Sequence, residues 1–540
     1  MAAALESFPV HNANAATARA VQGIAASLKL TYAFPAAVQA EASALAASPR
    51  IDDPTLVDLT GLPFVSIDGE SSRDLDQALF IEETDDGGGY LVHYALADAS
   101  FYAPVGSAIF SEALRRGATI YLPGAACRML PAELSEGVVS LNPLVDRRAV
   151  VLQVPLRGDG APAGATRAVR ARVRSRAKLS FSGVQRFFDA PGESPLAGTP
   201  FAPSLVLLER VGALLRARAA ARHVIDCERG GAHVVVDPAT GGLLGEPVKE
   251  TDCDRFNAQI SILANTEAAA LLGSGGDSAD GVVQPIFKVC APPDALALRR
   301  LKHDLDDIVR DADVPPAEAA SWRWDGALPL QEYLLGLPSG GRGARERLRC
   351  AITRQATLVG GGATYSATAA VHYGVGASAY TRFTAPMREV VGVFVHKELL
   401  EAIAGRGADP AEDRALRERV IAAAAAAKAA QSAASKAAYK LFLDGLLAED
   451  LGKPVAQRPW RRATVMGRKQ NLCFVTLDEP AGAEVKLYAP LERQGTGAAA
   501  APQPRIPQLR TGSGVRVRVL SHDDARERYM FEHERLEEAY

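Results

Sequence analysis

Residues 64–80 read FVSIDGESSRDLDQALF, and the rest of the chain is organised around this stretch. An apolar run predicts a strand that ends at Asp68, and a short polar loop follows it. Asp74 and Asp76 then flank a leucine at the start of a second apolar run, so in an extended chain both carboxylates point to the same side. We therefore expect three acidic side chains in one small volume.

Carboxylates that lie this close repel one another, and a hard divalent cation or trapped protons would relieve the repulsion. The stretch 64–80 contains neither His nor Cys, and a ligand set made only of oxygen atoms suits Mg²⁺ or Mn²⁺ rather than zinc. An aspartate-rich loop after a strand more often consists of caps and turn residues. The metal-site hypothesis therefore needs support from other parts of the chain.

Composition indicates an ordinary globular protein. The chain has 540 residues, of which 48% are apolar, which is enough for one large domain or several small ones. Its net charge of −3 does not indicate a nucleic-acid-binding protein, unless its basic residues gather in a channel. The six cysteines lie far apart, and no signal peptide or membrane-spanning run is evident. We expect a reduced, cytoplasmic protein with no membrane association.

Several short motifs follow the acidic stretch. They are Ala97-Asp98-Ala99-Ser100, Arg115-Arg116-Gly117, Tyr121-Leu122-Pro123-Gly124, Met129-Leu130-Pro131 and Ser140-Leu141-Asn142-Pro143. A second block, residues 379–388, reads AYTRFTAPMR. In this order the motifs resemble the RNB family of exoribonucleases, the RNase II and RNase R group, whose second block reads Ala-Tyr-Thr-His-Phe-Thr-Ser-Pro-Ile-Arg.

The resemblance implies an α+β fold. A large mixed RNB catalytic domain is expected over 59–450, and a C-terminal OB-type RNA-binding barrel over 458–540. The segment 1–58 is too short for the two cold-shock barrels of RNase II and RNase R, and its Ala-rich pattern predicts helices instead. Beyond residue 454 the pattern changes to five short strands, which supports the barrel.

Secondary structure can be predicted for several other segments. Helices are expected at about 180–224, 255–272 and 411–447, and strands at 463–466, 472–477, 484–488, 515–520 and 526–533. Arginines occupy every second position of 170–176, so on a strand their guanidinium groups share one face. That face is either a solvated outer surface or a stripe that contacts phosphates.

The resemblance also implies an activity and its residues. The activity is processive, metal-dependent hydrolysis of single-stranded RNA from the 3′ end to nucleoside 5′-monophosphates, by a monomer. The expected residues are Asp68, Asp74, Asp76 and Gln77 for Mg²⁺, with Mn²⁺ as a substitute; Asp74, Asp76 and Arg388 for catalysis; and Tyr121, Tyr380, Arg382 and Arg388 for RNA. A guanidinium can grip two phosphoryl oxygens as negative charge builds on them. An aromatic ring that stacks on a base contributes about 1–3 kcal/mol regardless of sequence.

The chain departs from the family pattern at informative positions. Gln77 stands where most members have a fourth aspartate; its carbonyl can bind a hard cation but brings no charge, so metal affinity should fall. Glu389 replaces the family's second basic residue, and the acid expected on the long helix near Ala434 is missing. Two alternatives stay open: an RNB-fold RNA-binding protein whose catalysis has lapsed, and a phosphatase with a DxD nucleophile, in which the block ending at Arg388 has no place.

Overall fold

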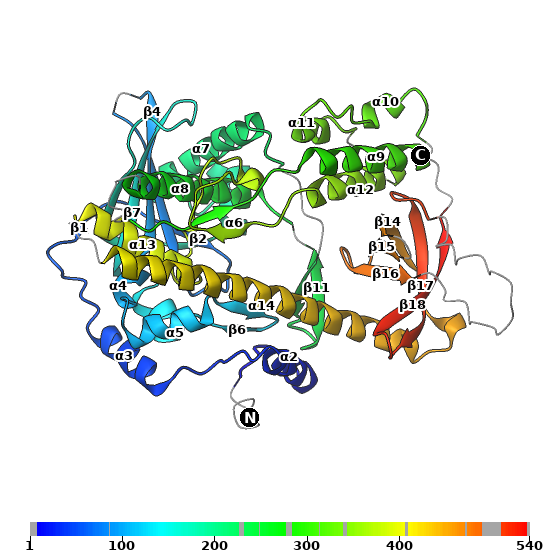
Figure 1. Ribbon diagram of the computed structural model, residues 1–540, viewed down its shortest axis with the longest axis horizontal. Helices are drawn as coiled ribbons and strands as arrows, with labels where there is room; N and C mark the ends of the chain where they lie inside the picture. Colours follow the sequence, from blue (N-terminus) through cyan, green and yellow to red (C-terminus); the bar gives the residue numbers. More distant parts are fainter. Residues whose placement is uncertain are drawn as a thin grey trace.

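The computed structural model shows a mixed α+β fold, as predicted. It describes residues 8–85, 87–225, 232–247, 249–276, 283–312, 314–338, 343–405, 409–469, 472–488 and 509–536. The N-terminal part forms two helices, α2 (Ala15–Ser27) and α3 (Ala36–Ala47), as its composition predicted (Figure 1). No helix among the described residues combines the length and apolar character that a membrane span requires.

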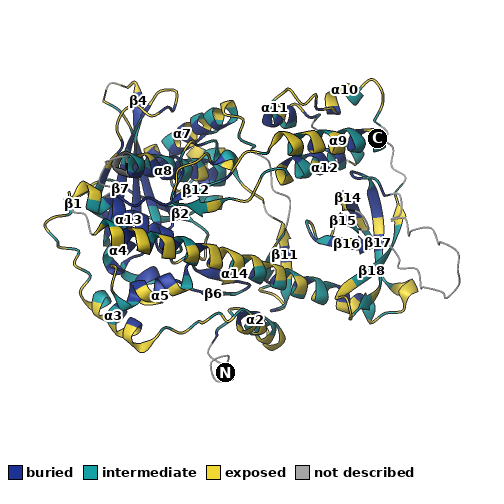
Figure 2. Ribbon diagram, in the orientation of Figure 1, coloured by how far each residue is buried: buried dark blue, intermediate teal, exposed yellow. Residues whose placement is uncertain are grey.

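A five-stranded sheet of order β1-β8-β7-β4-β3 forms the centre of the large body. Its strands are β1 (Val57–Asp58), β3 (Gln77–Glu83), β4 (Gly89–Ala97), β7 (Asp146–Arg157) and β8 (Arg167–Arg174). All neighbours pair antiparallel except β1 with β8. The central strands β4 and β7 are almost wholly buried, which explains their continuous apolar runs (Figure 2).

Helices and short strands complete the large body. They are α4 (Ala99–Tyr102), α5 (Ala108–Arg116), α6 (Phe181–Asp189), α7 (Ala202–Ala221), α8 (Asp252–Gly276), α13 (Val390–Ile403), β2 (Ser66–Asp68), β5 (Ile120–Leu122), β6 (Ala125–Cys127), β9 (Lys178–Ser180), β10 (Ala232–Val236), β11 (Leu243–Pro247), β12 (Phe287–Val289) and β13 (Thr364–Ser366). Apolar side chains of α7, α8 and α13 belong to the same core as those of the sheet. The predicted helical segments at 180–224 and 255–272 are confirmed.

The acidic stretch forms a loop between two strands. Strand β2 pairs parallel with β9 and ends at Asp68, as the apolar run predicted. The loop returns through Leu75, which is buried, and enters β3 at Gln77. Ser140 and Leu141 hold this loop in place, since the Ser140 hydroxyl accepts the Leu75 N–H at 2.9 Å and Leu141 N–H donates to the Leu75 carbonyl at 3.0 Å.

Helix α14 (Pro410–Leu451) links the large body to the C-terminal sheet (Figure 1). The helix was predicted to span residues 411–447. Asp409 caps its first turn by accepting the Ala411 N–H at 2.9 Å. Buried alanines line the side of the helix that packs on α2 and on the β5–β6 hairpin. Their small side chains allow the close approach of these elements.

The C-terminal part is a five-stranded antiparallel sheet of order β16-β15-β14-β17-β18. The strands are β14 (Arg461–Lys469), β15 (Leu472–Leu477), β16 (Glu484–Tyr488), β17 (Gly514–Asp523) and β18 (Arg528–Arg535), close to the predicted ranges. The edge strands β16 and β18 approach one another. The Arg528 guanidinium lies 4.5 Å from the centre of the Tyr488 ring. A curved sheet with nearly meeting edges is the form expected of a partly open OB-type barrel.

A helical insertion between β12 and β13 was not predicted. It consists of α9 (Ala295–Asp311), α10 (Ala319–Trp322), α11 (Leu330–Leu335) and α12 (Ala344–Leu358). Its own small core surrounds Trp322, which is fully buried. The insertion contacts the C-terminal sheet. The Gln355 side chain donates to the Met466 carbonyl at 2.7 Å.

The alternating arginines of β8 are part of the scaffold. Arg170, Arg172 and Arg174 form ion pairs at 2.7, 2.6 and 2.6 Å, respectively with Asp98, Asp58 and Asp146. Arg176 donates to a backbone carbonyl. Because acids already neutralise these guanidinium groups, the structure favours the outer-surface alternative over a phosphate stripe.

Candidate active site

The two informative blocks of the sequence, the acidic stretch 64–80 and residues 379–388, meet at a buried ion pair. Arg388 Nε donates to Asp76 Oδ2, and the Met387 N–H donates to Asp76 Oδ1 at 2.9 Å. Asp76 is fully buried, whereas the Arg388 side chain is 34% exposed. The guanidinium therefore lies at the boundary between the acidic loop and solvent. The predicted meeting of these residues, 312 positions apart, is confirmed.

A buried asparagine on α8 holds the Arg388 block. Asn265 Oδ1 accepts the N–H groups of Phe383 and Thr384 at 2.7 and 3.1 Å. Its Nδ2 donates to the hydroxyls of Tyr380 and Thr384, both at 3.0 Å. The sequence analysis predicted the helix but gave this residue no role. An amide at a fully buried position of an apolar helix is the signal that could have indicated it.

His396 on α13 contacts the same block at Phe383. Its Nε2 lies 2.8 Å from the Phe383 carbonyl, and its ring centre is 4.0 Å from that of Phe383. Full burial lowers the pKa of His396 to about 4. At neutral pH the imidazole is therefore uncharged and donates its Nε2 proton to the carbonyl.

This burial predicts an acid-sensitive fold. A pKa of about 4 in the folded chain, against about 6.5 when unfolded, means that stability is complete above pH 6.5 and lost as pH falls toward 4, by about 3 kcal/mol. Denaturant unfolding at pH 7 and at pH 4.5 measures this loss. In His396→Gln the pH dependence should shrink by that amount, whereas His303→Gln, at an exposed position, should keep the parent's slope. Equal slopes in all three proteins would contradict the prediction.

Asp74 lies near the ion pair, and Asp68 lies near Asp74. Asp68 Oδ1 accepts the Gly69 N–H at 2.7 Å and the Ser72 hydroxyl at 2.8 Å. Burial raises the pKa of Asp74, and the nearby charge of Asp68 raises it further, while Arg388 opposes this rise. Burial also raises the pKa of Asp76, against the opposing charge of Arg388. A cation beside Asp74 would offset its loss of hydration.

Asp76 keeps acceptor sites with which it could bind a hard divalent cation. Asp76 uses one lone pair on each oxygen for Arg388 and Met387 and retains others, since an ionised carboxylate offers about four acceptor sites. The oxygen atoms of the three aspartates do not all lie within 4.8 Å of one another. Among the described residues, Glu398, Glu401 and Asp413 meet that criterion, but the Lys397 ammonium lies among them and contacts all three at 2.8–2.9 Å.

Gln77 begins β3 and faces the interior. Its Oε1 accepts the Tyr94 hydroxyl and lies 3.5 Å from the Ser261 hydroxyl. Strand geometry points Gln77 away from the side that Asp76 occupies. The predicted role of Gln77 as a metal ligand therefore requires its carbonyl oxygen to accept the Tyr94 hydroxyl with one lone pair and to bind the cation with the other.

Gln77→Asp tests this role. We expect the Mg²⁺ concentration at half-maximal rate to fall by roughly 3- to 10-fold, because the new carboxylate adds a negative charge to the site. Gln77→Asn is the matched control, because it shortens the side chain equally and adds no charge. Titration of RNA hydrolysis with Mg²⁺ and with Mn²⁺ measures the effect. If the Asp and Asn variants have the same metal requirement, position 77 does not contribute to the metal site.

Tyr121 lies at the rim of the site. It is the middle residue of β5; its neighbours Ile120 and Leu122 are buried, and its own side chain is 46% exposed. Partial burial raises the pKa of the Tyr121 hydroxyl to about 12, although the positive charge of Arg388 opposes the rise. The ring therefore lies beside the guanidinium with a face open to solvent, which suits contact with a base.

Tyr380 and Arg382 both make contacts within the protein. Tyr380 is only 6% exposed and packs on the His372 ring at 5.1 Å. This burial leaves little of the Tyr380 ring open to RNA, and its RNA-binding role stays a prediction. Arg382 Nε donates to Glu389 at 2.7 Å, and Glu389 also accepts the Tyr365 hydroxyl at 2.6 Å. The unexpected acid Glu389 is thus the partner of Arg382.

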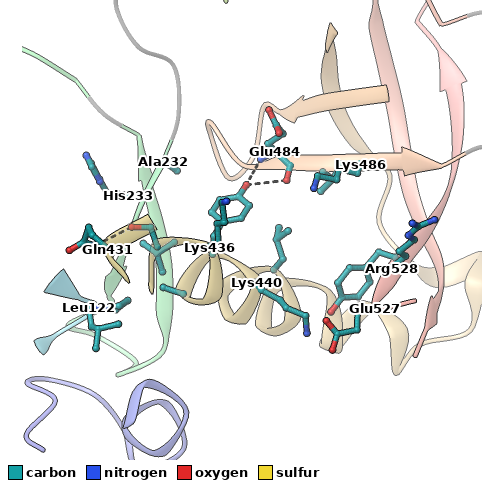
Figure 3. Close-up of a pocket in the computed structure, with 18 of the residues that line it drawn as sticks. Leu122, Ala232, His233, Gln431, Lys436, Lys440, Glu484, Lys486, Glu527 and Arg528 are labelled. Atoms are coloured by element: carbon teal, nitrogen blue, oxygen red, sulfur yellow. Dashed lines mark hydrogen bonds between the residues drawn. The ribbon is translucent and has the colours of Figure 1, made fainter. Parts of the chain in front are cut away.

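A groove connects Tyr121 with the C-terminal sheet (Figure 3). It has a volume of about 730 Å³ and runs between β10, α14, β16 and β18. Its charged lining residues are Lys436, Lys440, Lys486 and Arg528, against Glu484 and Glu527. Aromatic side chains, among them Tyr121 and Tyr439, lie between them. An excess of cations interleaved with aromatic rings suits a single-stranded polyanion.

Comparison of the sequence with protein families identifies the family of this chain. The RNB domain model matches residues 56–405, which contain both informative blocks. The chain belongs to the RNB family. Nucleases of this family depend on a metal, in agreement with the carboxylate set described above.

Curated relatives cover the same part of the chain. Ribonuclease R of Vibrio cholerae is 27% identical over 387 residues, which are 71% of this chain and 44% of the relative. Exoribonuclease 2 of Erwinia tasmaniensis is 31% identical over 374 residues, 67% of this chain and 53% of the relative. The chain thus spans about half the length of these RNB relatives.

Solved structures share the fold. RNase R of Mycoplasma genitalium, in complex with ribose-methylated single-stranded RNA, superposes with a TM-score of 0.79 at 18% identity, covering 95% of this chain and 77% of that one. Yeast Ssd1, described as a pseudonuclease, gives 0.60 at 15% identity, covering 82% of this chain and 51% of that one. The RNB fold therefore occurs both with RNA bound and in a protein described as a pseudonuclease.

Proposed function

We propose that the protein is a metal-dependent 3′-to-5′ exoribonuclease that hydrolyses single-stranded RNA processively to nucleoside 5′-monophosphates, as a cytoplasmic monomer. The observation that carries this proposal is the Asp76–Arg388 pair, because it joins an acidic loop to a partly exposed guanidinium. RNA binding alone does not require three acids beside a polyanion, since they would repel it. A site that handles phosphodiesters chemically does require both signs of charge.

The side chains of this site have distinct roles in the proposed reaction. Asp68, Asp74 and Asp76 would hold Mg²⁺, which, when bound, polarises the scissile phosphate and lowers the pKa of water. Arg388 would bind two phosphoryl oxygens and stabilise the charge that develops on them. Its bond to Asp76 fixes the guanidinium before the substrate arrives, so little reorganisation is needed. Tyr121 would stack on a base near the 3′ end.

The groove would guide the RNA to this site. Its cationic residues Lys436, Lys440 and Lys486 would follow the phosphate backbone, and its aromatic rings would accept bases of any identity. The C-terminal sheet forms one wall, in keeping with its predicted role as an RNA-binding barrel. Arg382 lies on the same block as Arg388 and, although Glu389 pairs with it, would contact the RNA through the exposed part of its side chain.

A digest of labelled RNA tests the proposal. A single strand labelled at its 5′ end should shorten from the 3′ end in Mg²⁺, and nucleoside 5′-monophosphates should appear. A strand whose 3′ end is paired in a duplex serves as the comparison for access. An unlabelled trap added after binding tests processivity, because a processive enzyme finishes the strand that it holds. Internal cuts, or nucleoside 3′-monophosphates, would overturn the proposal.

An RNB-fold RNA-binding protein without catalysis is the second candidate. Gln77, in place of an expected fourth acid, and the likeness to the fold of yeast Ssd1 favour it. The same digest separates the candidates: tight binding of the labelled strand with no mononucleotide at any Mg²⁺ or Mn²⁺ concentration would establish the second. Release of mononucleotides would exclude it.

A further inference from the structure

Tyr121 lies on a short hairpin that needs contacts with other elements to be stable. Strands β5 and β6 have three residues each and, among the strands that the structure describes, pair only with one another. An isolated two-stranded hairpin is marginally stable in water, so contacts with other elements must fix it. The position of the Tyr121 ring therefore depends on what touches the hairpin.

A side chain on α14 binds the free edge of β5. Gln431 Oε1 accepts the Tyr121 N–H at 2.8 Å, and Gln431 Nε2 donates to the Tyr121 carbonyl at 3.1 Å. The carboxamide thus serves both backbone groups of one residue, as a neighbouring strand would. An amide side chain offers a donor and an acceptor on two adjacent atoms, whereas a carboxylate at neutral pH can only accept. Figure 3 labels Gln431 at the same end of the groove as Leu122, the residue that follows Tyr121 on β5.

The N-terminal segment holds the other side of the hairpin. The His11 N–H donates to the Gly124 carbonyl at 2.8 Å, in the turn between β5 and β6. Gly124 has a φ of +68°, and a Cβ there would lie 2.7 Å from the His11 carbonyl oxygen, so only glycine fits this approach. Phe8, together with Ile24 of α2, packs in one core with Ile120 and Leu122. The hairpin is thus clamped between α14 and the N-terminal segment.

We propose that Gln431 is the positioning residue for Tyr121: its carboxamide fixes the edge of β5 so that the phenol ring meets a base of the RNA beside Arg388. This inference rests on the proposed exoribonuclease function. It also explains why an amide is suited to this position on α14, since a carboxylate would lose one of the two bonds and would repel RNA.

A double-mutant cycle tests the proposal without cleavage. The probe is a single-stranded RNA with 2-aminopurine near its 3′ end, whose fluorescence is quenched by stacking, in EDTA so that no hydrolysis occurs. Tyr121→Ala should weaken binding about tenfold and abolish the protein-dependent quenching. Gln431→Leu should weaken binding about three- to fivefold and reduce the quenching. The double variant should be no weaker than Tyr121→Ala alone, because without the ring there is nothing to position.

Controls make each outcome decisive. Ser432→Ala changes an exposed neighbour on α14 and should match the parent. Gln431→Glu keeps the acceptor for the Tyr121 N–H and loses the donor, so it preserves part of the clamp and should still reduce the quenching. If the effects of Tyr121→Ala and Gln431→Leu multiply in the double variant, or if Gln431→Leu quenches like the parent, the proposal fails. A parent that binds and quenches but releases no mononucleotide would overturn the enzyme function and leave the positioning role standing.

Discussion

Asp76→Asn is expected to lower the rate of RNA hydrolysis by about 10³-fold. The asparagine nearly matches the aspartate in shape, so Oδ1 can still accept the Met387 N–H. Its amide group, however, would face Arg388 Nε with a donor against a donor, which releases the guanidinium. The site loses one ligand charge and the orientation of Arg388 together. Single-turnover hydrolysis at saturating protein measures the chemical step directly.

The matched control is Asp146→Asn, which also removes an acid from an arginine pair, but the pair is with Arg174 of the central sheet and not with Arg388. It should hydrolyse RNA like the parent. Binding of RNA in EDTA should be retained in Asp76→Asn, because the substitution removes a negative charge from the path of a polyanion. Degradation of oligonucleotides by Asp76→Asn at the parent's rate would contradict both the proposed mechanism and the meaning given to the ion pair.

Local pattern predicted much of the fold. The C-terminal strands alternate apolar and polar residues with period two, and that alternation alone sets their limits to within a few residues. The long helix α14 followed from its alanine content, since helix propensity acts within a segment. The insertion α9–α12 was not predicted, because its helices form their own core and match none of the motifs that guided the prediction.

The site was predicted mainly from the order of the RNB-like motifs along the chain, and less from the spacing of residues within any one motif. Nothing local in the sequence indicates that Asp76 and Arg388 touch; the resemblance to the RNB family supplied that expectation. A linear motif also does not state which of its side chains turn inward, so the burial of Tyr380 was not predicted. Asn265 and Gln431 were missed for a related reason. Their importance lies in hydrogen bonds to residues more than 100 positions away, which only the folded chain brings together.

Arg388→Lys is expected to reduce kcat by about 10²-fold while RNA binding in EDTA changes by less than about threefold. Lysine keeps the charge, so the attraction to RNA remains. A single ammonium, however, cannot pair with Asp76 and also hold two phosphoryl oxygens in a plane, which the guanidinium fork can do. Steady-state kinetics on a short oligonucleotide separate kcat from KM.

Two further variants sharpen that test. Arg382→Lys makes the same change six positions earlier on the same block, where Glu389 already holds the guanidinium, and its effect on kcat should be smaller, about threefold or less. Arg388→Ala should lose about 10³-fold, and added guanidinium ion should restore part of the rate by occupying the vacated space. A loss confined to KM, or an equal loss in Arg382→Lys, would mean that Arg388 acts by attracting RNA and not at the phosphate under attack.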